Sequence, residues 1–83
     1  MITLDMVMRA EQIVIRANAI CSMSKRCGKH LEFYVSEIKR ARSEEEYLKI
    51  KRKVQRIRLL HDRLHDEAGE LEKELDIMKE AST

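Results

Sequence analysis

The segment of this sequence with the clearest capacity for chemistry is His61-Asp62-Arg63-Leu64-His65. Two histidines four residues apart share one face of a helix, which is the ligand spacing of the zinc-binding pattern His-Glu-x-x-His. Aspartate stands here in place of the glutamate, and Cys21 would pass near His65 if two long helices packed antiparallel. A metal site with cysteine and histidine ligands is therefore one interpretation of this segment.

We favour a structural role for the first of these histidines. His61 falls on the apolar side of its helix and would lie opposite Ser24, where a polar pair satisfies a buried group and fixes the register of two helices. The sequence has no glycine-rich phosphate loop and no nucleophile beside a base, and two helices form no concave scaffold around a reaction. We therefore predict a non-enzymatic protein without metal, cofactor or catalytic residue, in which Ser24 and His61 form a buried polar layer.

The composition predicts an all-α protein. Charged residues at 39%, no proline and two glycines are typical of long helices with solvated faces, and 83 residues allow a single domain, residues 1–83. The longest apolar run is three residues, so we expect neither a membrane span nor a signal peptide and predict a cytoplasmic protein. Cys21 and Cys27, six residues apart on one helix, point in different directions and are expected to be buried free thiols.

Capping signals divide the chain into two helices. Thr3 can cap the first helix and Asp5 adds negative charge to its first turn, and no breaker follows until about residue 41. Ser43 and Glu46, three residues apart, form a capping box at the start of the second helix. The sequence therefore predicts helices over residues 3–41 and 44–80, a turn at residues 42–43, and a frayed tail after residue 80.

Apolar residues recur at alternating spacings of three and four along both predicted helices, which is the pattern of a coiled coil. Folding the chain back at residue 42 brings the two series into register, so that Ile38 pairs with Tyr47 near the turn and Met6 with Met78 near the termini. The sequence thus predicts an antiparallel helical hairpin. Its predicted core contains Ile13, Ile20, Leu31, Tyr34, Ile50, Val54, Ile57, Leu64, Leu71 and Leu75.

A second apolar surface remains outside this seam. Two helices alone bury little surface, so a lone hairpin of this size would be marginally stable. A four-helix bundle, made from two hairpins or from one hairpin and the helices of another protein, would cover the surplus residues. The predicted partner or oligomer interface contains Met6, Val7, Met8, Val14, Ile15, Cys21, Val35 and Leu60.

Charge is unevenly distributed along the predicted hairpin. Residues 39–63 contain ten Lys or Arg and four acids, whereas residues 64–83 contain two Lys and seven acids. The turn end is therefore basic, and this is either an ordinary solvated surface or an anion-binding tip for nucleic acid or an acidic partner. No aromatic residues for base stacking are interleaved with the basic ones. The candidate anion-binding residues are Lys49, Lys51, Arg52, Lys53 and Arg56.

Three functions are compatible with these features. The leading one is a small helical chaperone or adaptor that forms a homodimer or binds the amphipathic helices of another protein, an architecture similar to that of the hairpin chaperones of bacterial secretion systems. The alternative is a small homodimeric regulator that binds nucleic acid with its basic turn end. The third is a structural coiled-coil segment of a larger assembly. No membrane partner is expected.

Overall fold

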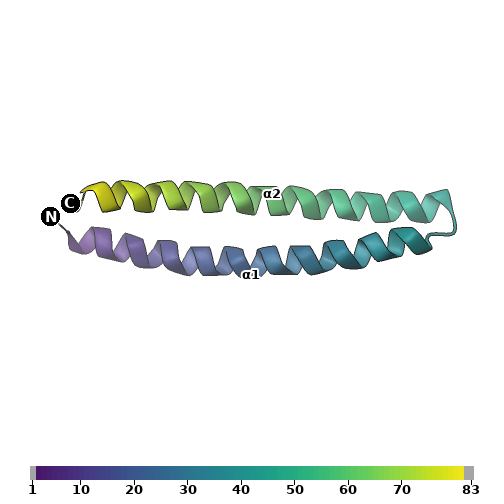
Figure 1. Ribbon diagram of the computed structural model, residues 1–83, viewed down its shortest axis with the longest axis horizontal. Coiled ribbons are helices and arrows are strands. Elements are labelled where there is room, and N and C mark those ends of the chain that lie inside the picture. The colour runs from purple at the N-terminus through teal and green to yellow at the C-terminus, as the bar shows by residue number, and fades with distance from the viewer. Residues whose placement is uncertain (1, 82–83) are drawn as a thin grey trace.

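The computed structural model describes residues 2–81 and shows two helices that are folded back on each other, so that the start of the first helix and the end of the second lie at the same end of the molecule (Figure 1). α1 spans Leu4–Arg40 and α2 spans Glu44–Ala81. No strand occurs in the described part of the chain, and the Cα atoms extend over 63 × 15 × 15 Å. The predicted all-α class with two mutually packed helices is confirmed.

The helix boundaries differ from the predicted ones by single residues. α1 is one residue shorter at each end than predicted, and α2 continues one residue farther, to Ala81. Ser82 and Thr83 of the predicted tail lie outside the described residues. The connection at residues 41–43 uses no positive backbone φ angle, because Ala41 leaves α1 in an extended conformation.

Side-chain caps explain where both helices begin. Thr3 Oγ1 accepts a hydrogen bond of 3.2 Å from the backbone N–H three residues later, and Asp5 lies in the first turn, where the helix dipole favours negative charge. In the turn, the Glu46 N–H donates to Ser43 Oγ at 3.2 Å, while the Glu46 carboxylate accepts from the Arg42 N–H at 3.1 Å. The predicted capping box is present, with its carboxylate reaching one residue farther back than the cap residue itself.

The core is one narrow strip between the helices. Ile13 is completely buried, and Leu64 of α2 packs in a buried cluster with Ile20 and Cys27 of α1. These four are the buried hydrophobic side chains of the described residues. The other predicted core residues are half-buried, and they are Leu31, Tyr34, Ile50, Val54, Ile57, Leu71 and Leu75.

Two predictions about burial are wrong, those of the Ser24–His61 polar layer and of Cys21. Ser24 and His61 are half-buried rather than buried, and no polar side chain of the described residues is buried. The interhelical ion pairs of the described residues lie nearer the termini and do not cover the seam beside Ser24 and His61, so these two side chains keep access to solvent. Cys21 is exposed because it lies beside the seam, whereas Cys27 lies in it and is buried.

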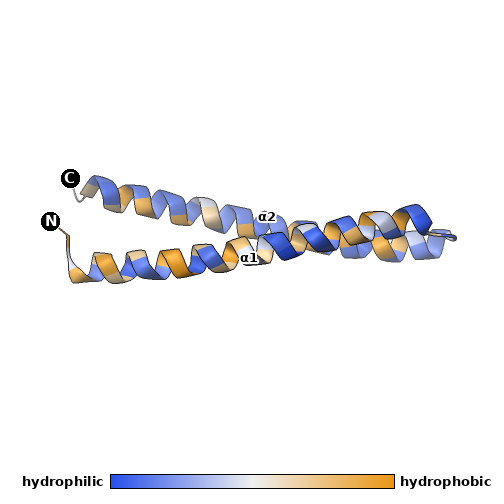
Figure 2. Ribbon diagram, turned by 60° about the horizontal axis from the view of Figure 1, so that its bottom comes forward, coloured by the Kyte–Doolittle hydropathy of each residue, from blue (hydrophilic) through white to orange (hydrophobic). Residues whose placement is uncertain are grey.

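The hairpin exposes more surface than its mass requires. Its accessible surface is 7116 Å², whereas a compact monomer of this mass exposes about 5,200 Å². The elongated shape of the hairpin, 63 × 15 × 15 Å, accounts for the difference. Hydrophobic residues are interspersed with hydrophilic ones along both helices (Figure 2), and several large hydrophobic side chains are exposed. In residues 2–81, neither helix contains an apolar stretch long enough to cross a membrane.

The capping contact of Ser43 can be tested with a matched serine. Ser43→Ala removes the acceptor for the Glu46 N–H, and we expect it to destabilise the fold by about 1 kcal/mol and to lower the Tm by roughly 4–8 °C. The measurement is thermal unfolding followed by circular dichroism.

The control is Ser36→Ala in the last part of α1, where the hydroxyl donates to the Glu32 carbonyl within the helix. Alanine is the better helix former at an interior position, so this variant should be as stable as the parent chain or slightly more stable. Equal losses of Tm in both variants would contradict the assignment of Ser43 as the cap of α2.

Candidate functional site

A row of small and apolar residues lies beside the seam on α1 and is left uncovered by α2. Val7, Val14, Cys21, Gly28 and Val35 recur every seven residues, so they form a line that follows the seam. The valines are 42%, 53% and 47% exposed, and Cys21 is exposed as well. A Cβ added at Gly28 would meet nothing within 4 Å. We call these five residues the α1 row.

Two further apolar side chains widen this surface near the N-terminus. Met8 is 51% exposed and Ile15 is 69% exposed. A shallow groove on the outside of α1 runs past Ile15 and is also lined by Val7 and Val14 of the α1 row. The uncovered apolar surface is therefore broadest in the N-terminal half of α1.

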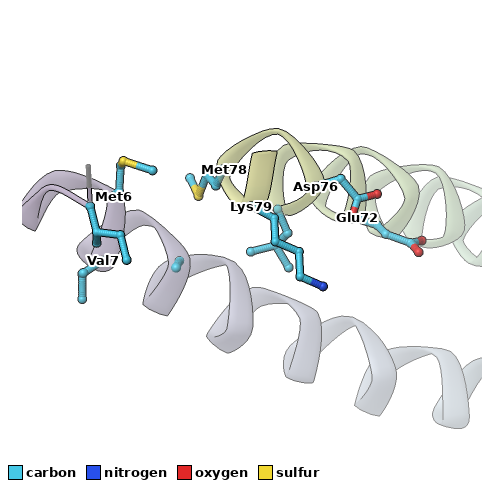
Figure 3. Close-up of a pocket in the computed structure, with 9 residues that line it drawn as sticks. Met6, Val7, Glu72, Asp76, Met78 and Lys79 are labelled. Carbon is cyan, nitrogen blue, oxygen red and sulfur yellow. The ribbon is translucent and has the colours of Figure 1, made fainter. Parts of the chain in front are cut away.

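The α1 row leads into a groove between the helices at the end with the termini (Figure 3). Met6 of α1 and Met78 of α2 reach toward each other across this groove, and both are half-buried. Acidic residues of α2 lie on its opposite wall. The groove is lined by Ile2, Met6, Val7, Ala10, Glu72, Leu75, Asp76, Met78 and Lys79.

Ion pairs close the other side of the seam in the same half of the hairpin. Arg9 donates two hydrogen bonds to the Glu74 carboxylate, at 2.7 and 2.9 Å, and Arg16 donates to Glu67 at 2.8 to 3.0 Å. The two arginines are seven residues apart and lie across the seam from the α1 row, because heptad positions on either side of a seam point in opposite directions. The row and the ion pairs therefore give the hairpin two unlike sides.

The Arg9–Glu74 pair also changes how its partners titrate. The hydrogen bond from Arg9, together with its positive charge, holds the pKa of Glu74 below its ordinary value, and the same hydrogen bond raises the pKa of Arg9. The hydrogen bond to Glu67 raises the pKa of Arg16 in the same way. Both pairs are exposed to solvent, so salt screens them.

Leu60 lies apart from the other predicted interface residues. It is 47% exposed and lines a groove with Met23, Cys27 and Ile57, on the side of the seam that carries the ion pairs. Arg9, Arg16 and Met23 are spaced seven residues apart on α1. Met23 therefore lies on the same side of the seam as the two arginines of the ion pairs. The eight predicted interface residues are thus divided between the two sides, with Met6 half-buried in the seam itself.

The structure does not assemble the histidine and cysteine residues into a metal site. His65 and Cys21 are exposed, and His61 is half-buried in the seam. Residues 2–81 contain no group of three or more histidine, cysteine, aspartate or glutamate side chains arranged to hold a metal ion.

The basic turn end keeps only part of its charge available to a ligand. Lys53 lies over the ring of Tyr34, with its Nζ 5.6 Å from the ring centre, and Lys49 pairs with Glu45 at 3.7 Å. The remaining three predicted anion-binding residues, Lys51, Arg52 and Arg56, are exposed. The three glutamates at the start of α2 lie in the same region.

Sequence reasoning missed both interhelical ion pairs, although the sequence contains the signal. The residue numbers of each pair add up to 83, next to seam pairs whose numbers add up to 84 or 85 in the predicted register. Opposite charges at that spacing on an antiparallel hairpin mark the positions that face each other across the seam.

The lowered pKa of Glu74 predicts how stability depends on pH. A carboxylate whose folded pKa is depressed stabilises the fold above its unfolded pKa, near 4.5, and this contribution is lost as the pH falls through the folded value. The Tm of the parent chain should therefore exceed that of Glu74→Gln at pH 7, and the difference should vanish toward pH 3.

Glu70→Gln is the control, because it removes an exposed carboxylate from the same helix with the same change in charge. It should affect the Tm at pH 7 less than Glu74→Gln does. A difference between the parent chain and Glu74→Gln that stays constant from pH 7 to pH 3 would contradict the linkage.

The chain matches no protein-family model, and comparisons with curated proteins and with solved structures find no match either. Function therefore has to be inferred from its own surface, which has an uncovered apolar row on one side of the seam and ion pairs on the other.

Proposed function

We propose that the protein is a non-enzymatic protein–protein interaction module that binds an amphipathic helix along the α1 row. The observation that carries this proposal is the contrast between the two sides of one seam. Arg9 and Arg16 cover one side with ion pairs to α2. On the other side, the three valines and Cys21 of the α1 row remain exposed.

The repeat of the row favours a helix as the binding partner. Positions seven residues apart on a helix are about 10.5 Å apart along its axis, so from Val7 to Val35 the row extends over about 42 Å. An uncovered line of this length fits the apolar stripe of another helix, which repeats at the same spacing. A contiguous exposed apolar surface on a small protein is typical of an interaction site.

The chaperone or adaptor role follows from the same surface. A helix that covers the row would hide its own apolar stripe from water while its charged face stays solvated, which is how a small helical chaperone keeps a partner segment from aggregating. The side chains at the end with the termini support this role, because Met6 and Met78 are flexible and adapt to partners of different shape.

A photo-crosslinking amino acid at position 14 tests the proposal. Val14 is in the α1 row and is 53% exposed, so a benzoylphenylalanine there should form covalent adducts with bound protein in cells that express the chain. The adducts should be lost when Val7 and Val35 are both replaced by lysine, since charged side chains in the row repel an apolar stripe.

Phe33 is the matched control for this experiment. It is also on α1 and is 59% exposed, but it borders His30 and Tyr34 on the side away from the row. Benzoylphenylalanine at position 33 should give few adducts. Equal adduct formation at positions 14 and 33, or none at either, would overturn the proposed function.

A second candidate function, nucleic-acid binding by the turn end, is favoured by the charge of the half of the hairpin that contains the turn. Residues 22–63 contain thirteen Lys or Arg and six acids, a net charge of +7. The phosphate backbone of DNA or RNA binds such surfaces without sequence specificity. The contacts of Lys49 and Lys53 with neighbouring side chains weigh against it.

Charge reversal distinguishes this candidate from the first. Replacement of Lys51, Arg52 and Arg56 by glutamate should abolish binding of a labelled single-stranded RNA if the turn end is the site. The affinity of the parent chain should then fall steeply between 50 and 200 mM salt, measured by fluorescence anisotropy. Absence of RNA binding by the parent chain at 50 mM salt would rule this candidate out and leave the crosslinking result unaffected.

A further inference from the structure

We propose that the occupant of the α1 row is a second copy of this chain, packed antiparallel about a two-fold axis that passes beside Cys21. This inference rests on the proposed function, because it names the partner of the same surface. It is carried by three observations, which concern the surface area, the positions within the row, and the distribution of charge.

The surplus surface is of the size that a stable dimer covers. The hairpin exposes 7116 Å², roughly 1,900 Å² more than a compact monomer of this mass. If each of two copies covered such a surplus, they would bury nearly 4,000 Å² together, within the range of about 2,000–5,000 Å² for obligate homodimers. A standard-size interface between two stably associated proteins buries about 800 Å² on each partner.

The row is symmetric about its own centre. In an antiparallel pair about a two-fold axis at Cys21, Val7 lies opposite Val35 of the second copy, and Val14 lies opposite Gly28. The space around Gly28 is open, since a Cβ there would meet nothing within 4 Å, and a valine from the second copy can fill it. Cys21 is one residue from the midpoint of Leu4–Arg40, so this alignment overlaps the two α1 helices along nearly their whole length.

The same axis brings opposite charges together. The turn half of the hairpin has a net charge of +7, and residues 1–21 with 64–83, the half that contains the termini, have a net charge of −5. An antiparallel pair places the basic half of each copy beside the acidic half of the other, whereas a parallel pair would place like charges together.

Individual residues of α2 agree with this arrangement. On one side of the seam, the residue numbers of the two partners in each ion pair add up to 83. On the side of the α1 row, the positions of α1 and α2 that face each other across the seam therefore have numbers that add up to about 86. Cys21 of α1 is thus level with His65 of α2. Arg58 and Glu72 are each seven residues from His65 and would face each other across the axis, twice in the dimer. The outermost pair, Lys51 and Lys79, has like charges and lies at the ends of the contact.

Cysteine crosslinking tests the register. In a background without Cys27, a short bis-maleimide should link Cys21 of one copy to Cys21 of the other. A single cysteine at position 14, with Cys21 and Cys27 both replaced by serine, should not link to itself, because the two copies of residue 14 would be about 21 Å apart along the axis. A mixture of the Val14→Cys and Gly28→Cys chains, both in that background, should crosslink.

Light scattering over a dilution series gives an independent readout. The parent chain should have twice the mass of the 9.8 kDa monomer, and Val14→Lys should raise the dimer dissociation constant by more than about 30-fold. Phe33→Lys, on the far side of α1, should leave the dimer unchanged. Arg58→Glu should weaken the dimer, and the double variant Arg58→Glu with Glu72→Arg should restore it.

A monomeric parent chain over the whole concentration range would overturn this inference. Crosslinking of Val14→Cys to itself as readily as Cys21 would also overturn it, because a parallel pair brings every residue of the row beside its own copy. Adducts of position 14 with other proteins, together with a monomeric mass, would overturn the inference and leave the proposed function standing. The absence of any adduct at position 14 would contradict both the inference and the proposed function.

Discussion

The seam between α1 and α2 is the one interface that holds this chain in a folded shape. A helix turns its apolar residues toward a single neighbour along one line, so a seam of two helices buries a strip only one or two side chains wide. Four hydrophobic side chains of the described residues are buried, and only Ile13 is buried completely. The length of the helices follows from this limit, because a narrow strip accumulates enough contact only over many turns.

The two sides of the seam contain different kinds of residue on α1. On one side, arginines of α1 reach across the edge of the strip and form ion pairs with glutamates of α2. On the other side, Val7 and Val14 occupy the equivalent positions on α1 and no charged side chain of α1 could bridge to α2 there. The lack of ion pairs on this side lowers the stability of the hairpin only slightly, since exposed ion pairs contribute little to stability. It leaves an apolar edge that another helix can cover.

The fold could be predicted from the sequence because each signal for it is local or periodic. The three-and-four spacing located the seam, and the Ser43–Glu46 capping box located the turn to within one residue. Burial was harder to predict. Ser24 and His61 occupy seam positions, but whether a seam position is sealed depends on neighbours outside the seam, which periodicity does not describe.

The candidate site was predicted only in part for the same reason. Val7, Val14 and Val35 were assigned to an uncovered surface, and the structure leaves them exposed. Leu60 was grouped with them because it is apolar and off the seam, yet it lies on the opposite side, with Met23. Hydrophobicity indicates that a side chain favours burial. The side of the seam on which it lies depends instead on the handed geometry of the two packed helices.

The position of the turn at the middle of the chain has a consequence for the order in which the hairpin forms. Ile38 and Tyr47 are nine residues apart in sequence, whereas Met6 and Met78 are 72 residues apart. Loop-closure entropy therefore favours contacts near the turn first, and each closed pair shortens the loop that the next pair must close. We therefore expect the hairpin to close from the turn toward the termini. Its last segment to close, and its first to open, should then be the end where the groove between Met6 and Met78 lies.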